Sequence, residues 1–403
     1  MIRQIEGGIT AVSGVSAFGL KDGKKGLAII LAEGPAAGVF TRNKVIAAPL
    51  IVTKEKLGTN GGFLSAVIAN SGNANAYTGE QGLKDAKEMT RLLAEKIKAD
   101  DKFIAVASTG VIGRKMDMNW ISSHIEPVLS SVSTTEEGSV GAMRAIMTTD
   151  LVPKVFACEV KTDAGSYRIA GIAKGSGMIE PNMGTMLGFV YTDAAVASGQ
   201  LQKCLTAAVN KSFNMIVVDG DTSTNDMCLL TATGKSGIRI TDGKSLEEFQ
   251  NALDLVLIEL AKMIAKDGEG ATKLVESTVI GAKTKEDAKL AAKSIVRSPL
   301  VKTAIFGNDP NWGRIVAAAG YSGADFDQTK ITLSVSDGTK TANLVKNGEI
   351  IEKDPAVLDE LKKIMSAKTI FIKIDLGAGP ETATAWGCDL TYDYVKINAE
   401  YTT

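Results

Sequence analysis

Near the middle of the chain, residues 174–189 read KGSGMIEPNMGTMLGF. Glycines at 175, 177 and 184 and a proline at 181 have the composition of a loop, and the apolar run 186–191 that follows is typical of a buried strand. Thr185 therefore stands at the mouth of a strand, directly after a glycine and a flexible loop. We hypothesise that the chain cleaves itself between Gly184 and Thr185, and that the freed Thr185 is a nucleophile.

A threonine at a new N-terminus carries its own base. Its free α-amine has an ordinary pKa of about 7.7 to 8, so at neutral pH part of it is unprotonated beside the hydroxyl that it must activate. The charge of Lys174 would favour the neutral amine and a nearby oxyanion or substrate carboxylate. The glycines would let the loop adopt the strained shape that self-cleavage needs. Residue chemistry alone fits an inert surface loop equally well.

The amino-acid composition argues against nucleic acid and anionic membranes as partners. The chain has 403 residues, enough for two or three hydrophobic cores, and its 45% apolar and 23% charged content is that of a globular protein. Lysine plus arginine (45) nearly cancels aspartate plus glutamate (46), so no basic field would attract nucleic acid or an anionic membrane. We therefore expect a small-molecule or protein partner.

The sequence shows no clear pattern of a signal peptide, a membrane helix, a metal site or a nucleotide-binding loop. The first residues lack the apolar core of a signal peptide, and no run approaches the ~20 uncharged residues of a membrane helix, so we expect a cytoplasmic protein. The four cysteines have no Cys-x-x-Cys spacing, which favours reduced, buried thiols and no metal site. Residues 234–236 resemble the end of a phosphate-binding loop, but Leu229 stands where its first glycine should be, and we expect no nucleotide cofactor.

The chain has a single histidine, His124, in residues 119–129, whose spacing predicts a short helix. Ile121, Ile125 and Val128 mark the buried side of this helix, so we expect His124 on its solvated flank in a structural role. A structural His124 excludes a Ser-His-Asp triad, a His-ligated zinc and a histidine general base together. Acyl-transfer chemistry in this chain then requires another base.

The order of the predicted elements indicates an α/β protein. Helices are predicted at residues 81–99, 140–147, 202–212, 245–265, 284–297 and 356–365, with a further helix starting at 312. Apolar runs predict strands at residues 26–32, 39–40, 50–52, 67–70, 103–109, 154–160, 167–173, 186–191, 215–218, 227–233, 274–281, 301–306, 369–376 and 382–397. A hairpin is expected over 330–346, with its turn at Asp337 and Gly338. The last residues, 398–403, have the position of a frayed tail.

Several polar segments are candidates for a site. The turn at Thr109 and Gly110 offers a backbone N–H and a hydroxyl to a developing oxyanion, although a plain turn at a strand end is the simpler explanation. An Asn- and Gly-rich loop at 70–76 and an acidic, hydroxyl-rich loop at 219–226 fit either ligand contacts or solvated turns. Glu269 stands between two glycines after a long helix and is a candidate ligand.

Residues 174–189 closely resemble the signature of the ornithine acetyltransferase family, also called glutamate N-acetyltransferases, which runs K-G-S-G-M-I-x-P-N-M-A-T-M-L-x-F. Further matches lie at residues 38–41, 47–49, 70–75, 108–113, 147–150, 267–273, 307–313 and 386–403. Because these segments follow one another in the same order over most of the chain, the resemblance is specific.

The resemblance implies an enzyme that moves an acetyl group from N2-acetylornithine to glutamate in arginine biosynthesis, by a ping-pong mechanism with an acetyl-threonine intermediate. It implies autocleavage into an α chain, residues 1–184, and a β chain, residues 185–403, which stay together as an α2β2 heterotetramer. No cofactor is implied, although members that also make N-acetylglutamate use acetyl-CoA as a second acetyl donor.

The resemblance also implies a fold and a set of site residues. The fold is a layered αββα sandwich resembling N-terminal nucleophile hydrolases, with a smaller C-terminal α/β portion from about residue 280. Thr109 and Gly110 become the oxyanion hole, and the substrate is bound by Lys174, Thr185, Glu269, Asn398 and Thr403. Two positions depart from the family pattern. Gly184 replaces an alanine, which should ease the strained turn, and Leu151 replaces a common threonine, which puts a hydroxyl contact to substrate in doubt.

Two other classes of protein stay open at this point. A related self-processing aminopeptidase or amidase would pass the acyl group to water instead of an amino acid. A binding module that is never cleaved would also fit the loop. Acetyl transfer to glutamate without acetyl-CoA would rule out the first alternative, whereas a persistent single chain of 42.2 kDa would support the second.

Overall fold

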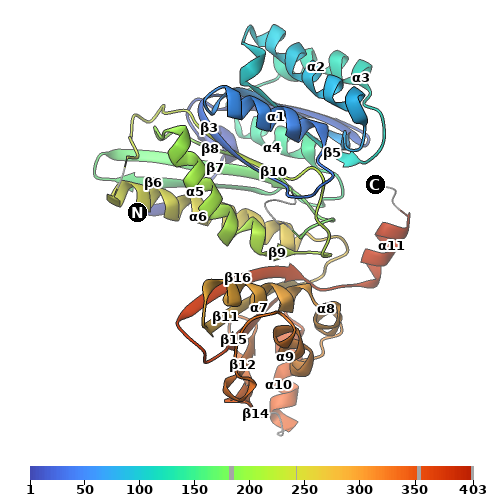
Figure 1. Ribbon diagram of the computed structural model, residues 1–403, viewed down its shortest axis with the longest axis vertical. Coiled ribbons are helices and arrows are strands. Elements are labelled where there is room, and N and C mark those ends of the chain that lie inside the picture. The colour runs from blue at the N-terminus through green and yellow to red at the C-terminus, as the bar shows by residue number, and fades with distance from the viewer. Residues whose placement is uncertain (181–185, 242, 352–354, 401–403) are drawn as a thin grey trace.

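The computed structural model describes residues 1–180, 186–241, 243–351 and 355–400. Figure 1 shows two bodies, a larger one that contains the N-terminus and a smaller one built mostly from the last third of the chain. Each body has one β-sheet with helices packed against it. The described elements also include short 3-10 helices at Gly8–Ala11, Asp101–Phe103, Phe213–Met215 and Gln328–Lys330.

The sheet of the larger body consists of β1 (Ile2–Ile5), β2 (Ser16–Asp22), β3 (Lys25–Phe40), β4 (Phe63–Asn73), β5 (Ile104–Val111), β6 (Val155–Thr162), β7 (Gly165–Lys174), β8 (Leu187–Thr192) and β10 (Met227–Ala232). Among the described residues its order is β1-β6-β7-β8-β10-β3-β4-β5, with β2 paired to β3. Strand β3 serves two layers: its first half pairs with β2 and β4, and its last residues pair with β10. The register with β4 shifts between Leu31 and Gly34, where the strand passes from one layer to the other.

Three apolar cores show that the larger body has an αββα arrangement. Helices α1 (Ala48–Thr59), α2 (Gly79–Ile97) and α3 (Met118–Ser130) cover the outer face of β3, β4 and β5. A second core lies between the two strand layers and includes Ile30, Val67 and Phe189, with α4 (Glu136–Ile146) at its edge. Helices α5 (Ser198–Lys211) and α6 (Gly243–Lys266) cover the opposite face. The expected layered α/β fold is confirmed.

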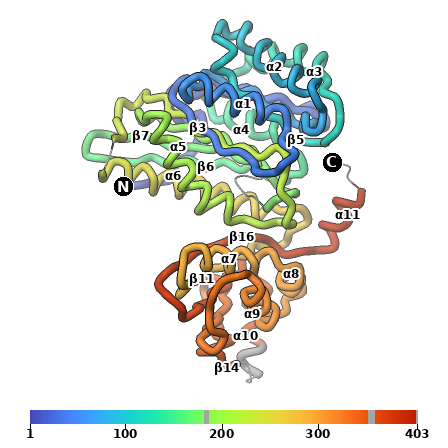
Figure 2. Tube along the Cα trace, in the orientation of Figure 1, coloured from blue at the N-terminus to red at the C-terminus, as the bar shows by residue number. Residues whose placement is uncertain are grey.

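The smaller body has a second sheet, ordered β14-β13-β12-β15-β11-β16-β9 among the described strands. These strands are β9 (Ile216–Val217), β11 (Leu274–Ala282), β12 (Thr332–Ser336), β13 (Thr341–Lys346), β14 (Glu349–Ile350), β15 (Thr369–Asp375) and β16 (Glu381–Cys388). Its helices are α7 (Lys285–Arg297), α8 (Pro299–Phe306), α9 (Trp312–Gly320) and α10 (Pro355–Met365). Helix α11 (Tyr392–Glu400) then leaves this body and returns beside the larger one (Figure 2).

Three predicted strands are wrong. Residues 50–52 belong to α1, which Pro49 opens with its fixed φ, and residues 301–306 form α8, where Pro299 lies in the first turn and the Ser298 side chain accepts from the Val301 N–H. Residues 382–397 are divided into β16 and α11, so residues 398–400 are helical instead of frayed. Short apolar runs fit a buried strand and a buried helix alike, and the capping residues decide between them.

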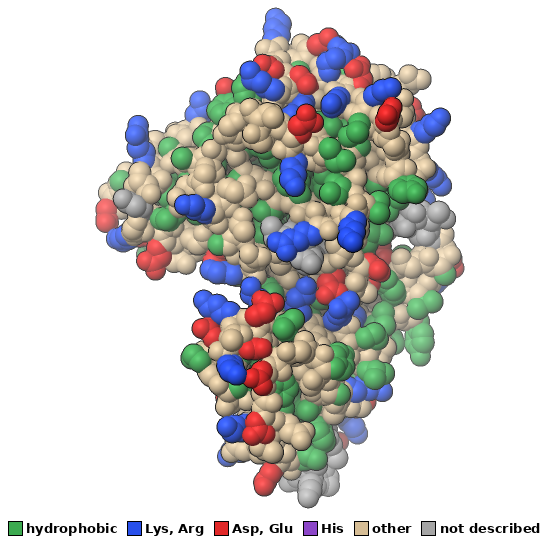
Figure 3. Space-filling model, viewed as in Figure 1, with side chains coloured by type: hydrophobic (Ala, Val, Ile, Leu, Met, Phe, Trp, Pro, Cys, Tyr) green, Lys and Arg blue, Asp and Glu red, His purple; other side chains and the backbone are tan. Residues whose placement is uncertain are grey.

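The predicted helix at residues 119–129 and the buried, free cysteines are confirmed. His124 is half-buried on α3, where its ring stacks on Trp120 with ring centroids 4.1 Å apart, and the four cysteines are buried and free. The face in Figure 3 carries interspersed basic and acidic side chains, in keeping with a net charge of −1. Across the described ranges, no helix combines the length and the apolar character that crossing a bilayer requires.

Candidate active site

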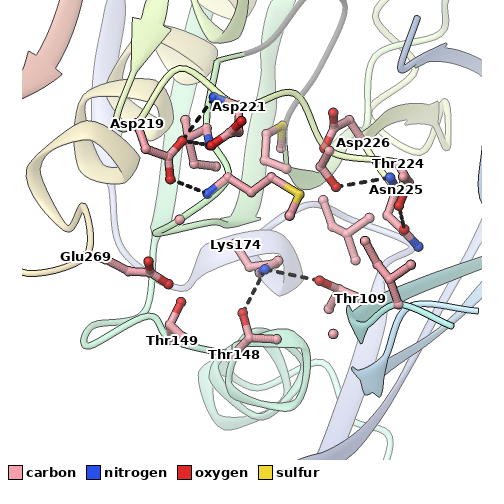
Figure 4. A pocket seen from close by; sticks show the side chains of 18 of the residues that line it. Thr109, Thr148, Thr149, Lys174, Asp219, Asp221, Thr224, Asn225, Asp226 and Glu269 are labelled. Carbon is pink, nitrogen blue, oxygen red and sulfur yellow. Dashed lines mark hydrogen bonds between the residues drawn. The ribbon is translucent and has the colours of Figure 1, made fainter. Parts of the chain in front are cut away.

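A cavity of about 130 Å³ lies where distant segments of the chain meet (Figure 4). The described residues that the family resemblance assigns to the site all line it: Thr109, Gly110, Lys174, Glu269 and Asn398. Gly184, Thr185 and Thr403 lie outside the described residues. Met186 also lines the cavity, and it directly follows Thr185 in the sequence.

Lys174 is a buried cation at the end of β7. Its side-chain Nζ donates to the hydroxyl oxygens of Thr109, at 3.1 Å, and of Thr148, at 2.9 Å (Figure 4). Burial lowers the pKa of Lys174, and the nearby carboxylate of Asp150 offsets part of that effect. The Lys174 amine therefore lies beside Thr109, where the sequence predicted an oxyanion site.

A buried ion cluster holds the start of the 174–189 segment in place. The Lys154 ammonium donates to Asp150 Oδ1 at 2.7 Å and to Asp267 Oδ2 at 2.6 Å. Asp150 also accepts from the Gly175 N–H at 2.7 Å, and the Ser176 hydroxyl donates to the Asp267 carbonyl at 2.7 Å. Burial alone would raise the pKa of Asp150, but the charges of Lys174 and Lys154 lower it to about 2.

The predicted turn at Thr109 and Gly110 is wrong, because both residues belong to the irregular end of β5, where position 110 requires glycine. Gly110 has φ +131°, and a Cβ added there would lie 2.4 Å from the carbonyl carbon of Gly72. The Asn-rich loop of Gly72 is itself braced, because Asn225 donates to the carbonyl oxygens of Ala74, at 2.6 Å, and Ser108, at 2.8 Å. Residues 70–73 of the predicted loop belong to β4 and pair with the end of β5, and none of the described residues 70–76 lines the cavity.

Helix α11 forms one wall of the cavity. The Asn398 amide donates to Glu269 Oε2 at 2.8 Å, and the Tyr394 hydroxyl donates to Asp219 Oδ2 at 3.3 Å. Glu269 is buried and faces Gly177, where an added Cβ would lie 2.3 Å from the Glu269 carboxyl carbon. The tail that the sequence marked as frayed thus contributes residues to the site.

The acidic loop at 219–226 also belongs to the site. Asp219 accepts from the backbone N–H groups of Met178, at 2.6 Å, and Ile179, at 2.8 Å, so it fixes the segment before residue 180. Thr148, Asp226 and Tyr394 line the cavity as well, although sequence reasoning did not assign them roles. Leu151 is exposed and is not among the described residues that line the cavity.

Comparison with known proteins identifies the family. The model of the ArgJ family matches residues 12–403. This chain belongs to the ArgJ family. A glutamate N-acetyltransferase of Methanosarcina mazei is 59% identical over 402 residues, which cover 100% of both chains. The arginine biosynthesis bifunctional protein ArgJ of Archaeoglobus fulgidus is 48% identical and covers 98% of this chain and 100% of its own.

A crystal structure of the arginine biosynthesis bifunctional protein ArgJ from Bacillus halodurans is also similar. It is 45% identical, with a TM-score of 0.49, and the match covers 52% of this chain and 96% of that chain. As an ArgJ family member, the chain is an acyltransferase of arginine biosynthesis.

Proposed function

We propose that this ArgJ family member transfers the acetyl group of N2-acetylornithine to glutamate, giving ornithine and N-acetylglutamate. In this proposal the chain first cleaves itself between Gly184 and Thr185. The freed Thr185 then takes the acetyl group as an ester and passes it on by a ping-pong mechanism, with its own α-amine as the base. One observation carries the proposal: the described residues that the family resemblance assigns to the site line one cavity that also contains Met186, the residue after Thr185.

The charges around the cavity suit an acetylated amino acid. Lys174 offers a cation to a substrate carboxylate, and Glu269 offers a carboxylate to a substrate amine. Thr109 and Gly110 would stabilise the oxyanion that forms when the acetyl carbonyl is attacked. Asn398, and Thr403 by resemblance, would complete the substrate wall at the end of α11. The relatives named above as glutamate N-acetyltransferase and ArgJ support the same reaction.

The test is an assay with N2-acetylornithine and glutamate in the absence of acetyl-CoA. We expect ornithine and N-acetylglutamate in equal amounts. Release of acetate without N-acetylglutamate would instead indicate an amidase that passes the acyl group to water. Assaying acetyl-CoA separately as the donor decides whether it is a second substrate.

Cleavage is tested on a denaturing gel. The active preparation should give two fragments, residues 1–184 and 185–403, and the Thr185→Ala variant should stay at 42.2 kDa without activity. Normal activity of that variant would refute the nucleophile assignment, and an active chain that remains at full length would refute self-cleavage. The proposed α2β2 assembly predicts a native particle that contains two copies of each fragment.

A further inference from the structure

Side chains from two neighbouring strands hold the end of helix α4. The carbonyl oxygens in the last turn of a helix have no partner within the helix. The Ser71 hydroxyl of β4 donates to the Ala145 carbonyl at 2.7 Å. The Lys21 ammonium of β2 donates to the carbonyl of Met147, the residue that caps the helix. Lys21 also donates to the Ser71 hydroxyl at 2.8 Å, so the two side chains hold the end of the helix together.

The packing leaves little room for the end of α4 to shift. Gly26 of β3 is close to Lys21, its partner in the pairing of β2 with β3. A Cβ added at Gly26 would lie 2.0 Å from the Ala145 carbonyl oxygen and 2.6 Å from the Ser71 Oγ atom. The last turn of α4 therefore packs directly on the strand backbone.

Thr148 follows Met147 in the chain and lines the cavity. Its hydroxyl accepts from the Lys174 Nζ atom at 2.9 Å (Figure 4). Thr148 lies outside the helices and strands, and its N–H donates to Asp150 Oδ2 at 3.0 Å. Because Thr148 is bonded directly to Met147, the contact of Lys21 with the Met147 carbonyl limits where the Thr148 hydroxyl can lie.

The charges of Lys21 and Lys174 also interact. Burial and, next, the charge of Lys174 lower the pKa of Lys21 to about 8, although the Asp150 carboxylate opposes both effects. Most of Lys21 is still protonated at neutral pH, so it has the N–H groups that its two contacts need. Lys21 is not among the described residues that line the cavity. Its effect on a bound substrate is therefore indirect.

We propose that Lys21 is a positioning residue for acyl transfer, which holds Thr148 where its hydroxyl accepts from the Lys174 ammonium. The inference rests on the proposed function, in which Lys174 faces the substrate. The alternative is a purely structural role, because a lysine near the C-terminus of a helix stabilises many helices. The two roles differ in one respect. A positioning residue acts on the reaction through Thr148, whereas a structural residue acts on the stability of the whole fold.

The test is a double-mutant cycle, measured by steady-state kinetics with N2-acetylornithine and glutamate. Lys21→Met removes the N–H groups of a long side chain, and we expect it to lower kcat/KM roughly tenfold, because small displacements within a site slow the reaction. In a Thr148→Val background the same change should cost no more than about twofold, because the hydroxyl that Lys21 positions is already absent. Lys21→Arg keeps the charge and the donors and should retain most of the activity.

Lys25→Met is the matched control. Lys25 lies on β3 beside β2, and its ammonium pairs with the exposed Asp117 at 2.7 Å. It is not among the described residues that line the cavity, and we expect wild-type kcat/KM from this variant. Thermal unfolding of all variants shows whether a loss of activity follows a loss of stability.

Equal losses in the two backgrounds, or wild-type activity of Lys21→Met, would overturn the inference. A crystal structure of Lys21→Met provides a second measurement that does not depend on the substrate. In it we expect the Thr148 hydroxyl to lie beyond hydrogen-bond distance of the Lys174 Nζ atom, and an unchanged contact would also overturn the inference. A wild-type chain that transfers no acetyl group would instead overturn the proposed function.

Discussion

At the scale of single residues, Thr109 has two tasks in the cavity. Its hydroxyl accepts from the Lys174 ammonium at 3.1 Å, and in the proposed mechanism the same residue helps to stabilise the oxyanion. A buried ammonium needs such acceptors, because desolvation otherwise favours its neutral form. Thr109 therefore contacts the Lys174 ammonium and, in the proposed mechanism, also the oxyanion.

We predict that Thr109→Val lowers kcat about 10²-fold or more, because an oxyanion donor is lost and Lys174 loses an acceptor. Thr109→Ser retains the hydroxyl and should keep most of the activity. Steady-state kinetics with N2-acetylornithine and glutamate measure both variants. Equal kcat values for the valine and serine variants would contradict an oxyanion role for this hydroxyl.

We predict that Gly110→Ala destabilises the fold by roughly 1–3 kcal/mol, because alanine is strained at φ +131° and its Cβ would meet the Gly72 backbone. Gly58→Ala is the control: Gly58 lies within α1, and an added Cβ has no neighbour within 4 Å. That substitution should stabilise the protein by roughly 0.5–1 kcal/mol. Urea unfolding gives both free energies, and a neutral Gly110→Ala would contradict the strain argument.

The sequence predicted the site unevenly at this scale. Thr109, Gly110, Lys174, Glu269 and Asn398 were assigned through their motifs, and the structure brings them to one cavity. Asp219 and Asp226 lie in a loop that also had the composition of a solvated turn. Asp219 accepts hydrogen bonds from the backbone of Met178 and Ile179, and Met227, which follows Asp226, donates to the Met186 carbonyl. These contacts join segments that lie far apart in the sequence. No local pattern contains such information.

At the scale of elements, α11 makes one wall of the cavity through few contacts. Tyr392 and Val395 of this helix are exposed in the described chain, whereas Asn398 reaches the buried Glu269. A change at Asn398 should therefore act on the site more than on the stability of the helix.

We predict that Asn398→Asp lowers kcat/KM roughly tenfold, equivalent to about 1.4 kcal/mol, because a second carboxylate would face Glu269. Lys396→Gln is the control, since it changes the net charge of the same helix by the same amount at an exposed position. Kinetics at constant ionic strength compare the two. A similar loss in both variants would indicate a general charge effect.

The ion cluster of Asp150, Lys154 and Asp267 joins the loop after α4 to the end of α6, and it predicts an acid response. The folded pKa of Asp150 is about 2 and its ordinary value is about 3.9, so its ionised form stabilises the fold above pH ~4. That contribution, about 2 kcal/mol, is lost as the pH falls through about 2.

We therefore predict that Asp150→Asn is less stable than the wild type at pH 7 and that the difference shrinks between about pH 4 and pH 2. Urea unfolding at several pH values measures both proteins. Asp85→Asn is a suitable control, because Asp85 is a buried aspartate of α2 outside the cluster. A stability difference that does not change with pH would contradict the role given to Asp150.

The sequence predicted long elements better than short ones. Residues 245–265 carry an apolar stripe over several turns, and they lie within the observed α6. Residues 301–306 are a short apolar run. Such a run shows neither the two-residue period of a half-buried strand nor the 3.6-residue period of an amphipathic helix, so periodicity does not distinguish the two. Ser298 and Pro299 immediately before them are the helix-start signal that the apolar run concealed.

At the scale of the whole molecule, the two proposed fragments share one sheet. Strands β7 and β3, from residues before 184, flank β8 and β10, from residues after 185. The apolar core between the strand layers likewise combines Ile30 and Val67 with Phe189 and Leu229. Neither fragment therefore contains the whole nine-stranded sheet or the whole core between its two layers.

We predict that the fragments stay associated after cleavage without any covalent link. Under native conditions they should elute together in size-exclusion chromatography, and they should separate in denaturant. The four buried cysteines are free, so a reducing agent should not change the result. Fragments that separate under native conditions would contradict the shared sheet.

The position of β8 and β10 between β7 and β3 also bears on how the protein is made. On the ribosome, β3 and β7 emerge before the strands that pair with their inner edges, so the growing chain presents two open edges around a gap. Open edges readily pair with other chains. A continuous polypeptide delivers β8 and β10 into this gap within the same molecule, which limits aggregation during synthesis. The order of the strands thus favours making the two proposed fragments as one chain, with the proposed cleavage following folding.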